Sequence, residues 1–310
     1  MILLTGGLGF IGTHTTRALL DLGEDCLLGQ RRTGPVPDFL PAAPGGRLAI
    51  EALDCTDATA LHDTCRRHGI TGIVHLAGAP LGGHPPIDEL WTNLEGLFAV
   101  LRTARELGIG RVVLASTIGV YGGLDVDVYR EDAPLPVAGA IPLAAYKKSA
   151  EILTGAVTDG PELINVRIGA IWGPLGRPSS FFFGAPQLIH AAATASVGDP
   201  PYGEDAVDMC YVRDCGRAIG LLLTAPSLRH HTYNIGSGTT TTNGEVADAI
   251  GRVVSGPAPA VTPGRSPHAP PRDAYLDITR LRTDTGYAPE YDLDGAVADY
   301  LAWLRAGHPR

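Results

Sequence analysis

Short apolar runs alternate with longer amphipathic stretches through the first half of the chain. The apolar runs, which we predict to be strands, are Ile2–Leu4, Cys26–Leu28, Arg47–Leu53, Ile70–Leu76, Arg111–Ala115 and Leu163–Ile168. The stretches between them, which we predict to be helices, are Phe10–Leu22, Ala58–His68, Ile87–Leu107 and Leu143–Val157. Strands that alternate with helices in this way are typical of a mostly parallel sheet covered on both faces. The pattern therefore predicts an α/β fold of the doubly wound, Rossmann type.

The first predicted strand is followed at once by a glycine-rich turn, Thr5-Gly6-Gly7-Leu8-Gly9-Phe10-Ile11-Gly12, and then by a helix. Gly6 permits the sharp turn, Gly9 lets backbone N–H groups approach a pyrophosphate, and Gly12 lets the helix pack close to the strand. The partial positive charge of the helix N-terminus faces the phosphates. This order of strand, glycines and helix predicts a dinucleotide-binding site.

The regular alternation loosens beyond Trp172, where Gly/Pro-rich segments surround a helix-like stretch over Gln187–Ala195. A regular pattern returns over Tyr211–Leu223 and Tyr233–Gly236. We therefore predict two parts. These are a dinucleotide-binding domain of residues 1–170 and about 206–236, and a smaller, mainly C-terminal substrate-binding lobe of about 171–205 and 237–310.

Composition narrows the class of partner. With 310 residues, 45% of them hydrophobic, the chain can bury a full core. A formal net charge of −9 argues against a nucleic-acid-binding surface. No apolar run approaches the roughly 18 residues of a membrane span, and Met1 leads directly into the first strand without room for a signal peptide. We expect a cytoplasmic protein whose partner is a small-molecule substrate, not a nucleic acid or a membrane.

Cysteine and histidine form no recognisable metal motif in the sequence. The ten histidines include no HExxH pattern. The five cysteines lack paired CxxC spacing and are Cys26, Cys55, Cys65, Cys210 and Cys215. We expect reduced thiols and no metal site.

Several short motifs recur in the order found in one large enzyme family. Besides the glycine turn, they are Asp54, His75–Gly78, Asn93 with Gly96, Ala115–Thr117, Val120–Gly122, Tyr146, Trp172–Pro174, Tyr211–Asp214 and Asn234–Gly238. With these residues the chain resembles the extended short-chain dehydrogenase/reductases, in the branch of the NAD-dependent epimerases and dehydratases. The resemblance spans almost the whole length. Its motifs are specific for the fold and much less so for the substrate.

The resemblance implies roles for individual residues. It places Asp54 beside the adenine of the cofactor, and it places Thr117 and Tyr146 on either side of the reacting carbonyl, in catalytic roles. The positions that it assigns to cofactor contact, besides the glycine turn and Tyr146, are Asp54, Cys55, Leu76, Ala77, Gly78 and Ile168.

The end of the second predicted strand indicates which dinucleotide is bound. NAD-using relatives carry an acid there, which holds the ribose 2′-hydroxyl. This chain instead has Gln30, Arg31 and Arg32. Two guanidinium groups offer planar, charge-assisted donors that suit a 2′-phosphate. We therefore expect NADP(H) in preference to NAD(H).

A lysine that the family pattern requires is missing. Family members place a lysine four residues after the catalytic tyrosine, one helical turn on, where it holds the nicotinamide ribose and lowers the tyrosine pKa. Four residues after Tyr146 stands Ala150. The only two lysines, Lys147 and Lys148, point about 100° and 200° away from Tyr146 around a helix. We therefore expect no cation beside Tyr146 and a phenol pKa near the ordinary value of about 10.

An unassisted phenol favours one direction of hydride transfer. Oxidation of an alcohol needs the phenolate, which is roughly one molecule in a thousand at neutral pH. Reduction of a ketone needs the neutral phenol as proton donor. Epimerases and dehydratases begin by oxidising a sugar hydroxyl, so they would lose the most activity when the phenolate is scarce. The sequence thus favours an NADPH-dependent ketoreductase in which Thr117, Tyr146 or the substrate supplies the proton.

Two substitutions bear on the charge of the substrate. Ala170 stands where relatives commonly carry an asparagine that contacts a diphosphate, and Val207 stands where they carry an arginine. Each lost contact is worth about 1.5–3 kcal/mol if it is charge-assisted. The arginines that could compensate are Arg177, Arg213 and Arg272. We expect a pocket for a less charged substrate.

Aromatic residues gather in the predicted lobe, at Phe181-Phe182-Phe183, Trp172 and Tyr202. Such a surface suits a flat hydrophobic ligand, for example a polyketide-like ketone of antibiotic biosynthesis. The rings could equally form the core of the lobe.

Two other functions stay open. One is a nucleotide-sugar epimerase or dehydratase with a remodelled site, and the other is a non-catalytic NADP-binding sensor. Retention of Thr117 and Tyr146 argues against the sensor. Many relatives dimerise through the helices that correspond here to Ile87–Leu107 and Leu143–Val157, so a homodimer is expected.

Overall fold

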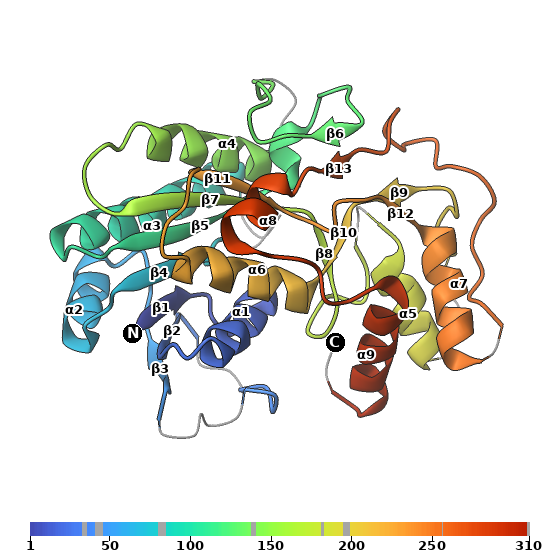
Figure 1. Cartoon of the computed structure of the whole chain (residues 1–310), viewed down its shortest axis with the longest axis horizontal. Helices are drawn as coiled ribbons and strands as arrows, with labels where there is room; N and C mark the ends of the chain where they lie inside the picture. Colours follow the sequence, from blue (N-terminus) through green and yellow to red (C-terminus); the bar gives the residue numbers. More distant parts are fainter. Residues whose placement is uncertain are drawn as a thin grey trace.

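A parallel β-sheet crosses the middle of the molecule (Figure 1). The computed structural model describes residues 1–32, 36–40, 46–79, 85–137, 141–180, 183–194, 199–255 and 257–308. Within these residues seven strands join in the order β11-β7-β5-β4-β1-β2-β3. Their bounds are β1 Ile2–Thr5, β2 Cys26–Gln30, β3 Leu48–Ala52, β4 Gly72–His75, β5 Arg111–Thr117, β7 Glu162–Ile168 and β11 Thr232–Ile235. The doubly wound α/β fold expected from the apolar pattern is confirmed.

The strand order reverses direction between β1 and β4. From β1 the chain builds outward through β2 to β3, and from β4 it builds the opposite way through β5 and β7 to β11. Thr5 at the end of β1 pairs with His75 at the end of β4, so both carboxyl ends open at the same level. Such a switch point leaves a crevice at the carboxyl edge of the sheet, where ligands bind in open α/β folds.

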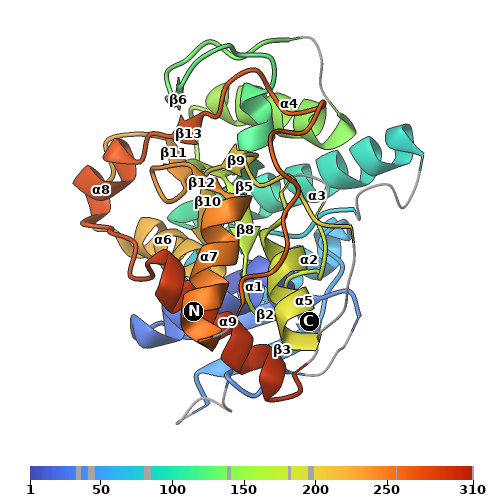
Figure 2. The same ribbon diagram turned by 90° about the vertical axis from the view of Figure 1, so that its right-hand side faces the viewer.

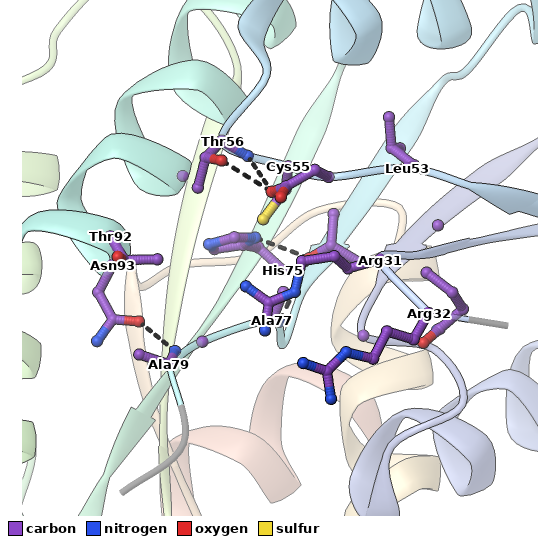
Figure 3. Close-up of a pocket in the computed structure, with 17 residues that line it drawn as sticks. Arg31, Arg32, Leu53, Cys55, Thr56, His75, Ala77, Ala79, Thr92 and Asn93 are labelled. Carbon is purple, nitrogen blue, oxygen red and sulfur yellow. Dashed lines mark hydrogen bonds between the residues drawn. The ribbon is translucent and has the colours of Figure 1, made fainter. Parts of the chain in front are cut away.

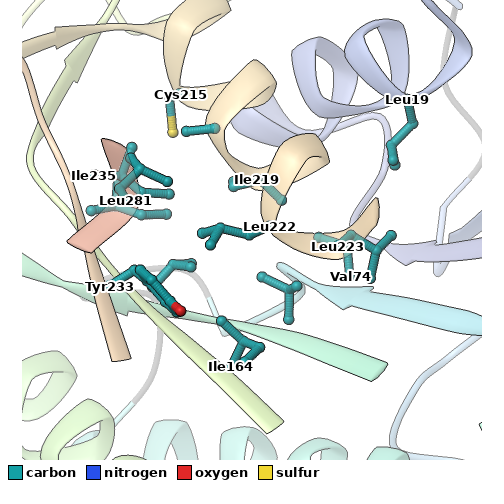
Figure 4. Close-up of a cluster of buried hydrophobic side chains, with 14 of the residues drawn as sticks. Leu19, Val74, Ile164, Cys215, Ile219, Leu222, Leu223, Tyr233, Ile235 and Leu281 are labelled. Atoms are coloured by element: carbon teal, nitrogen blue, oxygen red, sulfur yellow. The ribbon is translucent and has the colours of Figure 1, made fainter. Parts of the chain in front are cut away.

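Helices cover both faces of the sheet (Figures 1 and 2). On one face lie α1 (Phe10–Asp21) and α6 (Val212–Thr224), which enclose the hydrophobic cluster of Figure 4 with side chains such as Leu19 and Ile219. On the other face lie α2 (Ala58–His68), α3 (Pro86–Glu106) and α4 (Pro142–Gly155). Strands buried on both faces read as continuous apolar runs, which is why the sequence pattern identified them.

A third hydrophobic cluster lies apart from the sheet, around the buried side chain of Trp172. Three helices pack together there, at one end of the molecule (Figure 1): α5 (Ala185–Thr194), α7 (Asn243–Val254) and α9 (Leu293–Arg305). Phe183 packs against this cluster. Its position agrees with the alternative that the aromatic rings form the core of the lobe. Phe181, Phe182 and Ala195 lie outside the described residues.

Short paired strands and one short helix complete the described chain. They are β6 (Val128–Tyr129) with β13 (Tyr275–Leu276), β8 (Ala170–Trp172) with β10 (Met209–Tyr211), β9 (Ala206–Val207) with β12 (Thr241–Thr242), the 3₁₀ turn η1 (Ile118–Tyr121) and α8 (Thr279–Thr285). Among the helices that the structure describes, none has the length and apolar character needed to span a bilayer.

One arginine ties the amino edge of the sheet to a neighbouring helix. Arg111, the first residue of β5, donates from Nη1 to the carbonyl oxygens of Leu222, Leu223 and Ala225 at 2.9, 2.9 and 2.7 Å. Its Nε lies 2.6 Å from Oε2 of Glu162, the first residue of β7. The carbonyls at a helix C-terminus have no partner within the helix. Arg111 therefore satisfies the end of α6 and links it to two strands.

Close packing of α1 on α6 depends on glycine. A Cβ at Gly216 would stand 2.6 Å from the backbone carbon of His14 and 2.8 Å from the nitrogen of Thr15. A Cβ at Gly220, one turn further along α6, would meet only side-chain atoms, the nearest being Cδ1 of Leu22 at 3.1 Å. Backbone atoms cannot yield as a leucine methyl can.

We expect Gly216→Ala to be less stable than Gly220→Ala by about 1–3 kcal/mol, the usual cost of overpacking. Both substitutions gain the same helix propensity, so their difference isolates the contact with the backbone of α1. Urea unfolding of the two variants measures it. Equal free energies of unfolding would show that α1 and α6 are not held at this separation.

Candidate active site

A groove of about 260 Å³ opens at the switch point, over the carboxyl ends of β1 and β4. Figure 3 shows side chains from several elements facing it. Its described lining consists of Thr5, Gly6, 29–32, 53–56, His75, 77–79, Thr92, Asn93 and Gly96. The groove therefore lies where the strand order predicts a ligand, and most residues expected to touch the cofactor reach it.

The glycine turn forms one end of the groove. Gly6 has φ of +73°, a left-handed conformation that favours glycine. A Cβ at Gly12 would stand 2.3 Å from the carbonyl oxygen of Gly6, so no side chain fits there. Gly9 caps α1 without a side-chain hydrogen bond. The first N–H groups of α1 are therefore left for another acceptor, and a pyrophosphate is the acceptor that this turn suits.

Basic and amide groups gather where β2 ends. Arg31 and Arg32 are exposed, and within the described residues neither forms an ion pair. Figure 3 shows both side chains over the groove. Nε2 of Gln30 is buried and has no hydrogen-bond partner in the described part of the chain. A buried donor without a partner is unusual in a folded protein. These groups and the glycine cradle together fit a dinucleotide.

The loop after β3 supplies the acid expected beside the adenine. Oδ1 of Asp54 accepts hydrogen bonds from the backbone N–H of Thr56 at 3.0 Å and from its hydroxyl at 2.8 Å. This turn holds Asp54 and Cys55 in the lining of the groove. Burial raises the pKa of the Cys55 thiol to about 11, so the thiol is not a nucleophile at neutral pH.

The centre of the groove is held by side chains from β1, β4 and α3. Nδ1 of His75 lies 2.8 Å from the hydroxyl of Thr5. Oδ1 of Asn93 accepts from the backbone N–H of Ala79 at 2.8 Å and so fixes the loop after β4. Burial, and after it the charge of Lys147, lower the pKa of His75 to about 3. This imidazole is therefore neutral.

Some residues assigned to the cofactor lie beside the groove and do not line it. Ala77 and Gly78 line it, whereas Leu76 and Ile168 pack into the hydrophobic cluster of Figure 4. Ile11 also packs against that cluster. Phe10 lies near Gly176, whose added Cβ would stand 3.1 Å from its ring.

The two residues expected to flank the carbonyl have different surroundings. Thr117 ends β5, and its hydroxyl accepts from the N–H of Gly119 at 3.2 Å. Tyr146 is 4% exposed and belongs to the hydrophobic cluster beneath α3, with Leu97 and Val100. Its hydroxyl has no hydrogen-bond partner among the described residues. No hydrogen bond joins Tyr146 and Thr117 among the described residues.

The expectation that no cation lies beside Tyr146 is wrong. Nζ of Lys147 lies 4.8 Å from the centre of the Tyr146 ring. The helical angle gives the direction of the Cα–Cβ bond only, and the four-carbon stem of lysine turns back over the neighbouring ring. Nζ of Lys148 donates to the carbonyl oxygen of Pro136 and is thereby engaged elsewhere.

The pKa expected for Tyr146 is wrong as well. Burial, and after it the charge of Cys55, raise the pKa of the phenol to about 12 instead of leaving it near 10. Burial lowers the pKa of the Lys147 ammonium to about 8, an effect that the carboxylate of Glu151 partly opposes. Of the two groups, the lysine therefore titrates nearer to neutral pH.

A buried ion pair fixes α4 against the sheet. Nη2 of Arg167 on β7 lies 2.7 Å from Oε2 of Glu151, and the two side chains are 6% and 8% exposed. The hydroxyl of Ser116 on β5 also donates to Glu151. Sequence reasoning missed Lys147 and Glu151. Their separation of four residues, which puts a cation and an anion on one helical face, was the available signal.

A second hollow of about 200 Å³ lies near the cluster around Trp172. Its described lining includes Phe183, Gln187, Tyr202, Asp205 and Val207, and no basic side chain among the described residues borders it. Within the described residues no cluster of three or more metal-ligating side chains occurs.

Of the three arginines that could replace the missing phosphate contacts, two form ion pairs with carboxylates. Nη2 of Arg213 lies 2.9 Å from Oδ1 of Asp299. Arg272 pairs with Asp125 and Asp127 at 2.7 and 2.9 Å. Arg177 is exposed and has no ion pair with a described residue.

Comparison with known sequences adds a consistent set of relatives. The sequence profile described as the NAD dependent epimerase/dehydratase family matches residues 2–236. A UDP-glucose 4-epimerase of Azospirillum brasilense is 28% identical over 98% of this chain and 92% of its own length. A dTDP-glucose 4,6-dehydratase of Streptomyces niveus is also 28% identical, over the same shares of the two chains.

Solved structures share the architecture over the whole chain. MoeE5 in complex with UDP-glucuronic acid and NAD is 27% identical, with a TM-score of 0.77 and coverage of 99% of both chains. The UDP-glucose 4-epimerase of Thermotoga maritima with UDP-glucose is 20% identical, with a TM-score of 0.82 and coverage of 99% of both chains. The second likeness concerns the fold alone.

Proposed function

The chain belongs to the NAD-dependent epimerase/dehydratase family, and on that premise we propose that it transfers hydride between a nicotinamide dinucleotide and a nucleotide sugar, as an epimerase or dehydratase with a remodelled site. Support comes from relatives that match over the full chain, beyond the 2–236 segment of the family profile. Dinucleotides supply the hydride chemistry when bound, and the protein supplies binding, orientation and proton transfer.

The observation that carries the proposal is the ammonium of Lys147 beside Tyr146. The sequence argument favoured ketone reduction because it expected no cation at this place. With a lysine whose pKa is lowered to about 8, a group that can take and return a proton near neutral pH is present. The argument against initial oxidation of a sugar hydroxyl thereby falls, and a polyketide-like ketone is no longer favoured.

The remodelling concerns the substrate side. We propose that residues 1–170 and about 206–236 hold the dinucleotide and that 171–205 and 237–310 hold the substrate. The hollow beside the cluster around Trp172 is lined mostly by residues of the second part, with Ala206 and Val207 at the boundary, and it lacks a basic lining among the described residues. With Ala170 and Val207 in place of phosphate donors, Arg177 is the exposed arginine left to contact a diphosphate.

The function is tested by incubating the protein with NAD⁺ or NADP⁺ and a panel of UDP- and dTDP-sugars. We expect conversion of at least one sugar, detected by NMR of the product, with transient absorbance of the reduced dinucleotide at about 340 nm. Turnover of aromatic ketones without any sugar conversion would indicate a ketoreductase instead. Dinucleotide binding with no hydride transfer to either class would indicate a sensor.

We further propose that the chain prefers NADP(H). Arg31 and Arg32 line the groove and form no ion pair with a described residue, and Gln30 replaces the acid that would repel a 2′-phosphate. One of the solved relatives named above contains NAD. The proposed preference for NADP(H) therefore rests on the residues at the end of β2 in this chain, and not on the relatives.

Replacing both Arg31 and Arg32 with alanine is expected to weaken NADP⁺ binding at least tenfold, because two charge-assisted contacts to phosphate are lost. Binding of NAD⁺ should change less than threefold, since it carries no 2′-phosphate. Isothermal titration calorimetry measures both dissociation constants. Arg66→Ala, an exposed arginine on α2 outside the lining, serves as the control. Equal weakening for both dinucleotides would contradict the preference.

We also propose a homodimer through α3 and α4. Large apolar side chains stand exposed on these helices: Ile87 at 69%, Trp91 at 70%, Phe98 at 52% and Ile152 at 73%. The two helices pack against each other, and Trp91 and Phe98 border one hollow on α3. Exposed apolar side chains gathered on a soluble protein mark association sites.

Trp91→Glu is expected to convert the dimer into a monomer, because a charge in the centre of an apolar interface is left unpaired. Light scattering coupled to size-exclusion chromatography measures the mass. Val137→Glu changes an apolar side chain that is 96% exposed and lies outside α3 and α4. This control should leave the dimer intact. A wild-type protein that is monomeric at high micromolar concentration would refute the dimer.

A further inference from the structure

Helix α4 presents two different sides. Tyr146 and Ala150 belong to the hydrophobic cluster beneath α3. Glu151 binds Ser116 and Arg167 at the carboxyl ends of β5 and β7. Ala144, on the side of Glu151, lies 3.6 Å from the position of a Cβ added to Gly119 in η1. The second side of α4 therefore faces the carboxyl edge of the sheet.

Lys147 belongs to the side that faces the edge. It precedes Glu151 by four residues and follows Ala144 by three, and both spacings put residues on one helical face. Its charge acts on His75, which lines the groove. The ammonium therefore lies between the anchored Glu151 and the wall of the dinucleotide groove.

The side chain of Tyr146 packs in the hydrophobic cluster beneath α3. Its Cα–Cβ direction differs from that of Lys147 by about 100° around the helix. Its ring packs among apolar side chains, with its centre 4.8 Å from Nζ of Lys147. No hydrogen bond among the described residues orients the Tyr146 hydroxyl or connects it to a proton relay.

The stripe of α4 that faces the edge contains one group able to exchange a proton. Leu143 lies one turn before Lys147 and has no titratable group. In the family pattern the tyrosine stands four residues before the lysine, which is the position of Leu143 if Lys147 is counted as that lysine. One turn after Lys147, Glu151 is bound by Arg167 and Ser116. Only Lys147 remains on that stripe.

We propose that Lys147 is the catalytic residue that exchanges a proton with the reacting oxygen of the substrate, and that Tyr146 is a packing residue. The proposal rests on the proposed function for the identity of the substrate. The other part of it, that Lys147 titrates at the edge of the dinucleotide groove, does not depend on the substrate.

The step balances with a reduced nicotinamide dinucleotide as hydride source. In reduction, the carbonyl carbon receives the hydride and the π electron pair moves to the oxygen. The oxygen then takes a proton from the Lys147 ammonium, and the N–H bonding pair stays on nitrogen as the neutral amine. Solvent returns the proton. In oxidation, the neutral amine takes the hydroxyl proton as the hydride leaves for the oxidised dinucleotide.

Among the residues that the structure describes, few titratable groups face Lys147. From β4 comes His75, which is neutral, and from α4 itself come Tyr146 and Glu151. Arg167 of β7 faces Glu151 and balances its charge. Strand β5 contributes the uncharged hydroxyls of Ser116 and Thr117. A single limb near pH 8 is therefore assigned to the Lys147 amine, with the ammonium form below it.

The first test needs no substrate, because the chain has only two lysines. In the Lys148→Arg protein, trace acetylation with acetic anhydride from pH 6 to 11, followed by mass spectrometry, reports the Lys147 amine against the N-terminal amine. We expect a pKa near 8 and at least tenfold slower labelling with saturating NADP⁺. A pKa near 10, or labelling that NADP⁺ leaves unchanged, would overturn the proposal.

The second test uses a converted nucleotide sugar. Lys147→Met should lower kcat at least a hundredfold, the scale of general acid–base catalysis. Tyr146→Phe should stay within threefold of wild type and keep the wild-type pH limb, and Lys148→Arg is the control. For reduction the rate should fall above about pH 8, and for oxidation it should rise up to that pH.

A loss in Tyr146→Phe as large as that in Lys147→Met would assign the proton to the phenol and overturn the proposal. If wild type converts no nucleotide sugar while Lys147 still titrates near pH 8 and is shielded by NADP⁺, the function proposed above fails and the placement of Lys147 is supported. The two failures are therefore distinguishable.

Discussion

The buried ion pair between Arg167 and Glu151 holds α4 against the sheet, and the positions of Lys147 and Tyr146 follow from it. Nε of Arg167 lies 3.1 Å from both carboxylate oxygens, and Nη2 lies 2.7 Å from one of them. Removing either charge from such a pair leaves the other uncompensated in a dry environment, which is costly. Rotation of α4 would have the same effect. Lys147 is therefore held toward the sheet edge, and Tyr146 is held in the hydrophobic cluster beneath α3.

The sequence predicted the sheet and the glycine turn because both depend on local periodicity. Strands buried on two faces must be apolar throughout, and Gly6 and Gly12 occupy positions where a side chain is strained or collides. It also indicated the region of the groove, since the carboxyl ends of parallel strands open at one edge. The assignments of Leu76 and Ile168 to cofactor contact rest on the family resemblance and stay predictions. Ile168 belongs to the hydrophobic core, and Leu76 packs against it.

The interior of the site could not be predicted, because it depends on long-range contacts. Counting from Tyr146 led to Ala150 and to the conclusion that the lysine was missing. Counting from Glu151, whose partners on β5 and β7 only the structure reveals, leads to Lys147. The same limit applies to Arg213 and Arg272, whose ion pairs with Asp299 and with Asp125 and Asp127 only the structure reveals.

The clamp formed by Arg111 fastens the amino edge of the sheet. There one guanidinium joins the first residues of β5 and β7 to the last turn of α6 through four polar contacts. At the carboxyl edge Glu151 holds α4 to β5 and β7, whereas β1 and β4 end in loops that line the groove. We therefore expect any widening that admits a ligand to occur between these loops, while the amino edge stays closed.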